Sequence, residues 1–264
     1  MKKYLLIIFC LFCSIVFSSC DDEIYSQGID FNDKIDLPTS ISEISYDYNK
    51  SWGYRAYIEE DGDYVPFIVL SSDYNGYCLL LREYLLDELI EYNVPGEYGS
   101  YYSDSKVDTY LNETYYWVIS EDLRNKIIDS QIEITTRNAI DTHNDETEII
   151  SRKIFLLSAN EVNASLSNIL LKEGAPLSYF KEIENRTALH ENGEADSWML
   201  RTPALSGGNN LIGVGYDGSV GMGSISGIDG INESSVRPAF CVPLETKIEL
   251  SSDIVEGKDV FFIK

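Results

Sequence analysis

The sequence predicts an α+β fold, with strands early in the chain, helices in the middle and strands again at the end. Hydrophobic residues make up 44% and charged residues 24% of the 264 residues, as in a folded globular protein. Runs typical of strands lie before residue 82 and after residue 197, and helix-start signals lie between them. This segregation indicates α+β rather than an alternating parallel sheet.

Residues 1–19 have the layout of a signal peptide. Lys2 and Lys3 form a basic start, and the apolar run over residues 4–17 is too short for a comfortable bilayer-spanning helix. Small residues then precede Cys20, and this segment resembles the lipobox of bacterial lipoproteins. The resemblance implies that Cys20 becomes an N-terminus carrying acyl chains such as palmitate, which anchor the protein to a membrane. Ordinary signal cleavage and an uncleaved anchor are the alternatives.

Residues 20–51 are acidic and lack periodicity, so we expect a tether. The acidic residues 21–23 directly after Cys20 resemble an export signal for lipoproteins of the outer face of the outer membrane. We therefore expect a protein of the cell envelope, anchored in the outer membrane and exposed at the surface. The alternative is a solvated tether whose charge does not direct export.

The chain has 20 basic and 44 acidic residues and a formal charge of −24. A field of this sign repels nucleic acid and anionic lipid surfaces, so we expect no nucleic-acid partner. Cys78 and Cys241 both lie in apolar runs, which favours two buried thiols over a disulfide. Cys10 and Cys13 lie in the signal segment, and beyond it no CxxC or Cys/His spacing indicates a metal site, so we expect no cofactor.

The first ordered elements are strands. Residues 54–58 and 64–70 flank an acidic turn with Asp61 and Gly62, which predicts a hairpin. Residues 76–81 predict a buried strand. For residues 84–92 the pattern leaves strand and helix open.

Helix signals follow. Ser105 predicts the start of a helix through Asn112, and Ser120 with two acidic residues predicts another. Residues 132–136 predict a strand and residues 142–148 a loop.

A strand over residues 153–157 should run into a capping box made by Ser158 and Glu161. Pro176 fits the first turn of a short helix that ends near Asn185.

The last third is rich in glycine. Residues 211–216 and 219–225 flank Asp217 and Gly218, which predicts a second hairpin. Residues 236–242 predict a last core strand. We therefore expect a single domain over residues 52–245, followed by a C-terminal extension over residues 246–264 whose residues 260–263 form an edge strand.

Four segments in this order resemble an uncharacterised domain, a domain of unknown function, of bacterial surface and secreted proteins. They are Val65–Leu70 with Cys78–Leu81, Lys153–Ser158, Trp198–Pro203 and Ser235–Phe240. The closing half is similar to C-type-lectin-like folds, including the formylglycine-generating and sulfatase-modifying group. The resemblance implies a mixed, C-type-lectin-like antiparallel sheet with a helical middle and long glycine-rich loops.

The resemblance implies no reaction, because function depends on the site and not on the fold. The formylglycine-generating relatives use a pair of cysteines upstream of the final strand, whereas residues 197–237 contain none. This absence argues against such an oxidase. An enzyme of the sulfatase-modifying type or an unknown hydrolase remains the alternative to a binding protein.

Five residues of the matching segments form a structural signature: Trp198, Arg201, Pro203, Arg237 and Pro238. We expect the two arginines to brace the glycine-rich loops against the core, with the tryptophan packed beneath them. Anion binding by the arginines is the alternative.

The remaining reactive residues lack a recognisable site pattern. His143 and His190 lie in polar loops without a nucleophile motif, so we expect surface histidines and no catalytic residue. The acidic Asp-Gly turns near Asp61, Asp217 and Asp229 lack the spacing of a calcium loop, which favours β-turns.

We therefore predict a non-catalytic binding or adhesion module for a glycan or an envelope protein. Its 19 tyrosines offer amphipathic contact area. The glycine-rich loops over residues 206–235 should carry recognition, with Asp217, Asp229 and Asn232 as candidate binding residues. A structural subunit that pairs through residues 260–263 is a further alternative.

Overall fold

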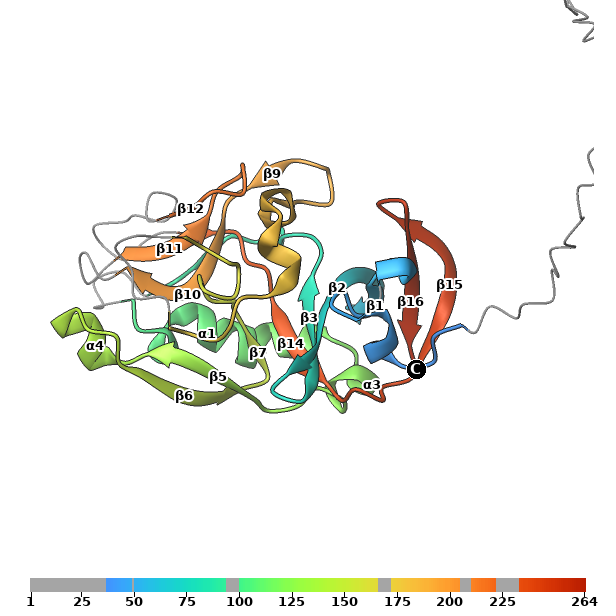
Figure 1. The fold of residues 1–264 in the computed structure, drawn as a ribbon, viewed down its shortest axis with the longest axis horizontal. Helices are drawn as coiled ribbons and strands as arrows, with labels where there is room; N and C mark the ends of the chain where they lie inside the picture. The colour runs from blue at the N-terminus through green and yellow to red at the C-terminus, as the bar shows by residue number, and fades with distance from the viewer. Residues whose placement is uncertain (1–36, 49, 94–99, 166–171, 205–209, 222–232) are drawn as a thin grey trace, which may run out of the picture. The chain divides into compact units, whose positions relative to one another are not determined.

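A seven-stranded sheet forms the centre of the fold, in the order β15-β16-β1-β2-β3-β14-β7 (Figure 1). Each neighbouring pair is antiparallel except β1 and β16, which run parallel. The strands span Arg55–Glu60 (β1), Asp63–Tyr74 (β2), Tyr77–Arg82 (β3), Ile154–Phe155 (β7), Ala239–Val242 (β14), Ile248–Val255 (β15) and Lys258–Ile263 (β16). This mixed sheet and the helices between its strands confirm the α+β class.

The computed structural model describes residues 37–48, 50–93, 100–165, 172–204, 210–221 and 233–264. Its folded unit extends from Leu37 to Lys264. Within these ranges, none of the helices has the length and apolar character needed to cross a bilayer.

The first hairpin is confirmed. Strands β1 and β2 pair from Arg55 to Glu60, and the turn residues Asp61 and Gly62 have φ values of 49° and 94°. Strand β3 lies between β2 and β14 in the sheet, and all of its residues except Tyr77 are buried. The continuous apolar run in the sequence therefore marked a central strand.

The segment before β1 is not a tether over its whole expected length. The 3₁₀ helices η1 (Ile41–Ile44) and η2 (Lys50–Trp52) precede the sheet, and Ile41 and Ile44 are fully buried. Ile41 N–H donates to the carbonyl of Thr246. The expectation of a tether to residue 51 is thus wrong from Leu37 onward, because isoleucines three positions apart share one face of a helical turn.

The expected edge strand over residues 260–263 is also wrong. Strand β16 lies between β1 and β15, so both of its sides are hydrogen-bonded and the edge is β15. The β15–β16 connection is a tight turn in which Glu256 and Gly257 both have positive φ. Half of the residues of β15 are polar and the apolar ones do not alternate regularly, so no strand was predicted there.

The helical middle consists of short elements. They are η3 (Tyr102–Asp104), α1 (Lys106–Tyr110), the π-helical η4 (Leu111–Tyr115), α2 (Tyr116–Val118), α3 (Glu121–Arg124) and α4 (Arg137–Thr142). Ser105 caps α1 as predicted, because its side chain accepts from Asp108 N–H. Ser120 precedes α3 without making a side-chain cap.

A hairpin of β5 (Ser130–Thr135) and β6 (Thr147–Arg152) flanks α4, so part of the expected loop over residues 142–148 is strand. Thr136 caps α4 at its N-terminus, and His143 ends it in the left-handed conformation. Helix α4 has only six residues, which is too short for hydrophobic periodicity to predict it.

Ser158 and Glu161 exchange both hydrogen bonds of a capping box, yet they close a turn and not a helix. After Pro176 the chain forms two 3₁₀ helices, η5 (Ser178–Lys181) and η6 (Ile183–Arg186), where one short helix was expected.

Small sheets complete the fold. They contain β4 (Ile90–Glu91) with β13 (Glu233–Ser234), β8 (Ala188–Leu189) with β9 (Ala195–Asp196), and β10 (Trp198–Ala204) with β11 (Asn210–Val214) and β12 (Val220–Gly221). In Figure 1 the β10–β11–β12 sheet and the β5–β6 hairpin lie on the β7 side, and β15–β16 form the opposite end of the central sheet.

The second hairpin is confirmed where it is described, since β11 and β12 pair around Asp217 and Gly218. Gly218 has a φ of +79°, and a Cβ there would lie 2.5 Å from the carbonyl oxygen of Ile183. Glycine is therefore required both by the turn and by its packing on η6.

Candidate functional site

The signature residue Arg201 is fully buried and forms a bidentate ion pair with the equally buried Glu161. Its Nη1 and Nη2 atoms lie 2.7 and 2.9 Å from the two carboxylate oxygens. Arg201 also donates to the carbonyls of Glu133 and Leu156. The guanidinium thus joins β10, the β5 strand and the turn at Glu161.

Arg237 is also buried, and it lies over the ring of Trp198. It donates to the carbonyls of Arg82 and Glu83, and its Cζ atom lies 5.3 Å from the centre of the tryptophan ring. Burial lowers the pKa of Arg237. Pro203 and Pro238 are buried beside these residues, so the five signature residues contribute to the core.

A third charged group, Glu173, completes this buried cluster. One carboxylate oxygen accepts from both the backbone N–H and the hydroxyl of Thr135, each at 2.7 Å, and the other accepts from the Thr202 hydroxyl. Burial raises the pKa of Glu173, against the opposing influence of Arg201. Because Arg201 already pairs with Glu161, the cluster holds two carboxyls for one cation.

We predict that Glu173→Gln flattens the pH dependence of stability. A folded-state pKa above the ordinary 4.5 gives stability that is complete below 4.5 and is lost as the pH rises through the folded pKa. The free energy of unfolding of the variant, relative to the parent, should therefore increase from pH 4 to pH 8. Urea unfolding across this range measures it, with the exposed Glu121→Gln as control. Parallel curves for Glu173→Gln and the parent would contradict the prediction.

Among the described residues, neither histidine pairs with a nucleophile. His143 is exposed at the end of α4. His190 Nε2 lies 3.6 Å from a carboxylate oxygen of Asp196, and the hydroxyl of Ser235 donates to that same oxygen at 3.1 Å. The serine thus contacts the acid and not the base, unlike a serine nucleophile with its histidine.

The predicted binding loop is described only in part. Asp217 is exposed at the hairpin turn and accepts from Ser219 N–H at 3.0 Å. Asp229, Asn232 and the lipidation residue Cys20 lie outside the described residues.

The cysteines and several tyrosines belong to the core. Cys78 and Cys241 are free and buried, and burial raises the pKa of both thiols to about 12. Tyr102 and Tyr115 are almost fully buried, whereas Trp117 is 63% exposed. In the part of the chain that the structure describes, no three His, Cys, Asp or Glu side chains gather as a metal site would need.

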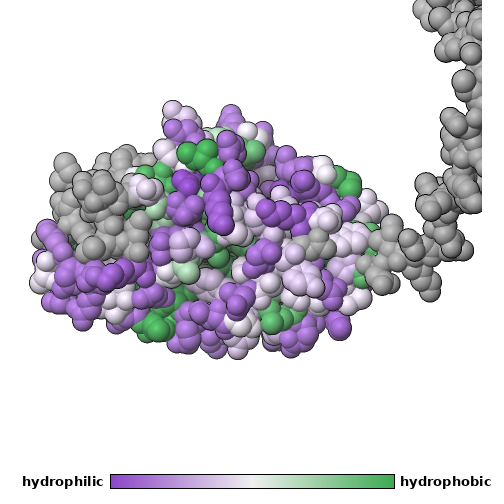
Figure 2. Space-filling model, in the orientation of Figure 1, coloured by the Kyte–Doolittle hydropathy of each residue, from purple (hydrophilic) through white to green (hydrophobic). Residues whose placement is uncertain are grey.

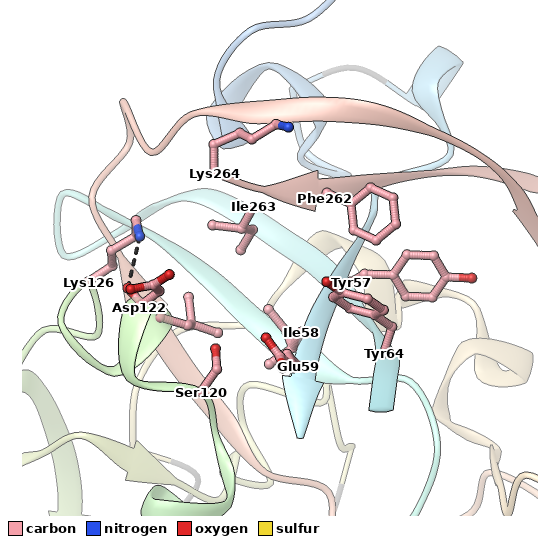
Figure 3. A pocket seen from close by; sticks show the side chains of 11 residues that line it. Tyr57, Ile58, Glu59, Tyr64, Ser120, Asp122, Lys126, Phe262, Ile263 and Lys264 are labelled. Carbon is pink, nitrogen blue, oxygen red and sulfur yellow. Dashed lines mark hydrogen bonds between the residues drawn. The ribbon is translucent and has the colours of Figure 1, made fainter. Parts of the chain in front are cut away.

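A groove of about 400 Å³ opens between β1, β16, the start of β2 and helix α3 (Figure 3). We call it the β1–β16 groove. Other grooves of about 280 and 530 Å³ lie beside Tyr74 and beside Trp117. The β1–β16 groove differs from both because three aromatic side chains gather on one of its sides.

These three side chains are Tyr57, Tyr64 and Phe262, and we call them the aromatic cluster. Their ring centres lie 5.0 to 5.9 Å apart. Tyr64 is 58% exposed, although it contacts both of the other rings. The exposed ring leaves apolar surface available to a ligand.

The opposite side of the β1–β16 groove is polar. Figure 3 shows Ser120, Asp122 and Lys126 of the α3 region facing the aromatic cluster across the groove, with Glu59 at its base. Lys126 Nζ donates to the backbone carbonyl of Asp122 at 2.8 Å, so the lysine caps the turn. The groove therefore offers an apolar surface opposite oxygen acceptors.

Sequence reasoning missed this groove. Alternation along β1 places Tyr57 and Glu59 on one face, which a strand pattern can show. Phe262 reaches the same face only through the parallel pairing of β1 with β16, in which Tyr57 lies opposite Phe262. No local pattern in the sequence predicts that β1 and β16, which are the first and last strands along the chain, pair with each other.

The comparisons identify a family but no characterised relative. The model of a domain of unknown function, DUF6273, matches residues 75–244, so the chain belongs to this family. The predicted resemblance to an uncharacterised domain is thereby confirmed. No curated protein and no solved structure matches the chain.

Proposed function

We propose that this member of the DUF6273 family is a lipid-anchored protein of the cell envelope whose domain binds a glycan or an envelope protein without transforming it. The observation that carries the proposal is the partly exposed aromatic cluster at the β1–β16 groove. Binding sites commonly combine apolar contact area with a few oriented polar groups, and this groove has both.

The two buried carboxyls with raised pKa values do not lie at a described groove. An enzyme needs accessible groups with perturbed pKa values that converge on a cleft. Burial raises the pKa of the carboxyls of Glu60 and Glu173, yet both are buried and neither lines a described groove. Glu60 is held by Arg82 and by the Tyr115 hydroxyl inside the core.

We further propose a C-type-lectin-like arrangement for the closing half. The support is the β10–β11–β12 sheet, which follows the helices and carries the Asp217–Gly218 turn. The proposed location in the cell envelope is supported separately by the signal-like residues 1–19 and by Cys20. The acidic residues after Cys20 favour the outer membrane.

Cys20→Ala should abolish acylation, because an acyl chain on the mature N-terminus needs the cysteine. Metabolic labelling with radioactive palmitate, followed by fractionation of membranes, measures the loss. Cys78→Ala is the matched control and should leave labelling intact, since that thiol is buried. Undiminished labelling of the Cys20→Ala chain would remove the lipid anchor from the proposal.

The binding proposal is tested with the full-length chain in detergent. We expect retention of at least one glycan or envelope protein on an array that displays both, measured with and without calcium, and recovery of the ligand unchanged. A chain that retains nothing, or that releases a chemically altered ligand, would overturn a non-catalytic binding function.

A further inference from the structure

We propose that the β1–β16 groove binds a pyranose unit of a neutral glycan, with the sugar ring face on the aromatic cluster and its hydroxyls on Glu59 and Asp122. This inference rests on the proposed binding function and names its ligand class and site. A sugar ring has an apolar C–H face and a rim of hydroxyls, so it needs an aromatic surface beside oxygen acceptors.

The three rings form a continuous surface and not a cage. Ring centres of Tyr64 and Phe262 lie 5.0 Å apart at 70°, and those of Tyr57 and Phe262 lie 5.3 Å apart at 35°. Each ring therefore contacts its neighbours directly. The ring face that Tyr64 leaves exposed can pack against the apolar C–H face of a sugar ring.

The sheet holds this surface in place. Tyr57 lies opposite Phe262, and Glu59 lies opposite Tyr64, on neighbouring strands. The alternate residues of the same strands, Ile58 and Phe261 among them, are buried in the core. Because side chains alternate between the faces of a strand, the buried face fixes the position of the exposed one. The surface thus costs little ordering on binding.

The polar side of the groove can accept hydrogen bonds from a sugar. Among the described residues, the carboxylates of Glu59 and Asp122 form no ion pair. Lys264 pairs with Glu249, and Lys126 donates to a backbone carbonyl. Two carboxylates thus face the groove as acceptors for hydroxyl donors, beside lysines that can donate to a sugar oxygen.

Charge decides between neutral and acidic sugars. The chain carries a formal charge of −24, and at the groove the carboxylates of Glu59 and Asp122 lie beside Lys126 and Lys264, of which Lys264 already pairs with Glu249. A uronic acid or sialic acid would therefore approach against the net negative charge of the chain. Figure 2 shows a largely hydrophilic surface with small, separate hydrophobic areas on the face that it displays, which suits a polar ligand better than a broad apolar partner.

The test uses the full-length chain in detergent and two probe sets: neutral oligosaccharides of hexose or N-acetylhexosamine, and acidic oligogalacturonate. Isothermal titration should show binding of at least one neutral probe. Tyr64→Ala should weaken it about tenfold, as expected for the loss of one stacked aromatic surface. Asp122→Ala should weaken it several-fold, and thermal unfolding should confirm that both variants fold.

Two tyrosine variants make the site assignment specific. Tyr48 is 69% exposed and lies outside the groove, so Tyr48→Ala should bind like the parent chain. Tyr216 is 68% exposed beside the Asp217 turn, so Tyr216→Ala tests the glycine-rich hairpin as the rival site. Loss of affinity in Tyr216→Ala, with Tyr64→Ala unchanged, would overturn the groove assignment and leave a binding function in place.

The remaining outcomes are also decisive. Preference for oligogalacturonate over every neutral probe would overturn the ligand class. Retention of an envelope protein, without any oligosaccharide, would overturn the sugar site but support the proposed function. A chain that retains neither probe set nor an envelope protein would overturn both.

Discussion

Arg201→Met should destabilise the folded domain by about 3 to 5 kcal/mol, because removing one partner of a buried ion pair leaves the other charge uncompensated. Glu161 is fully buried, and Arg201 supplies both of its bidentate contacts. The carbonyls of Glu133 and Leu156 would lose a donor as well. Urea unfolding followed by circular dichroism measures the change in the free energy of unfolding.

The double variant Arg201→Met with Glu161→Gln tests the cause. Removing both charges should recover part of the lost stability, since a neutral amide is less costly to bury than a lone carboxylate. Lys106→Met is a control for a more exposed pair, with Glu91, and should cost less than about 1 kcal/mol. If Arg201→Met costs no more than Lys106→Met, the buried pair does not stabilise the domain as we infer.

Local signals predicted the hairpins and the central strand. Asp-Gly turns require positive φ, and Asp61–Gly62 and Asp217–Gly218 each join antiparallel strands. The cap at Ser105 was equally local. The local signal at Ser158 predicted a helix start, but the capping-box bonds close a turn. The Glu161 carboxylate there also accepts from Arg201 and from the Tyr74 hydroxyl.

Long-range packing explains what the sequence could not show. The η1 segment is ordered because Ile41 and Ile44 enter the core and Ile41 bonds to the C-terminal part of the chain. Strand β15 forms because it pairs with β16, although half of its own residues are polar. Pairings between distant segments depend on tertiary context and leave no local periodicity.

The candidate site divides in the same way. Arg201 and Arg237 are buried, and among the described residues their guanidinium groups donate to strand and turn carbonyls and, for Arg201, to the Glu161 carboxylate. The aromatic cluster could not be assembled beforehand, since Phe262 and Tyr57 meet only across the parallel pair. A site built from the first and last strands depends on topology.

Trp198→Ala should cost about 3 to 5 kcal/mol, the range for removing a large buried aromatic side chain. Trp198 is fully buried, and its Nε1 donates to the carbonyl of Arg186 at 3.0 Å. The guanidinium of Arg237 would also lose the ring against which it lies, while remaining buried. Differential scanning calorimetry should show a lower Tm, by roughly 2 to 4 °C per kcal/mol for a domain of this size.

Trp198→Phe separates the ring from the hydrogen bond. It keeps an aromatic surface beneath Arg237 but leaves the Arg186 carbonyl without its donor, so its cost should be smaller, at about 1 to 3 kcal/mol. Neither variant should alter the affinity for an oligosaccharide in the folded state, because Trp198 lies in β10 and lines none of the described grooves. If Trp198→Ala kept the parent Tm and lost oligosaccharide binding, the recognition surface would lie at β10, and the β1–β16 groove would lose its claim to it.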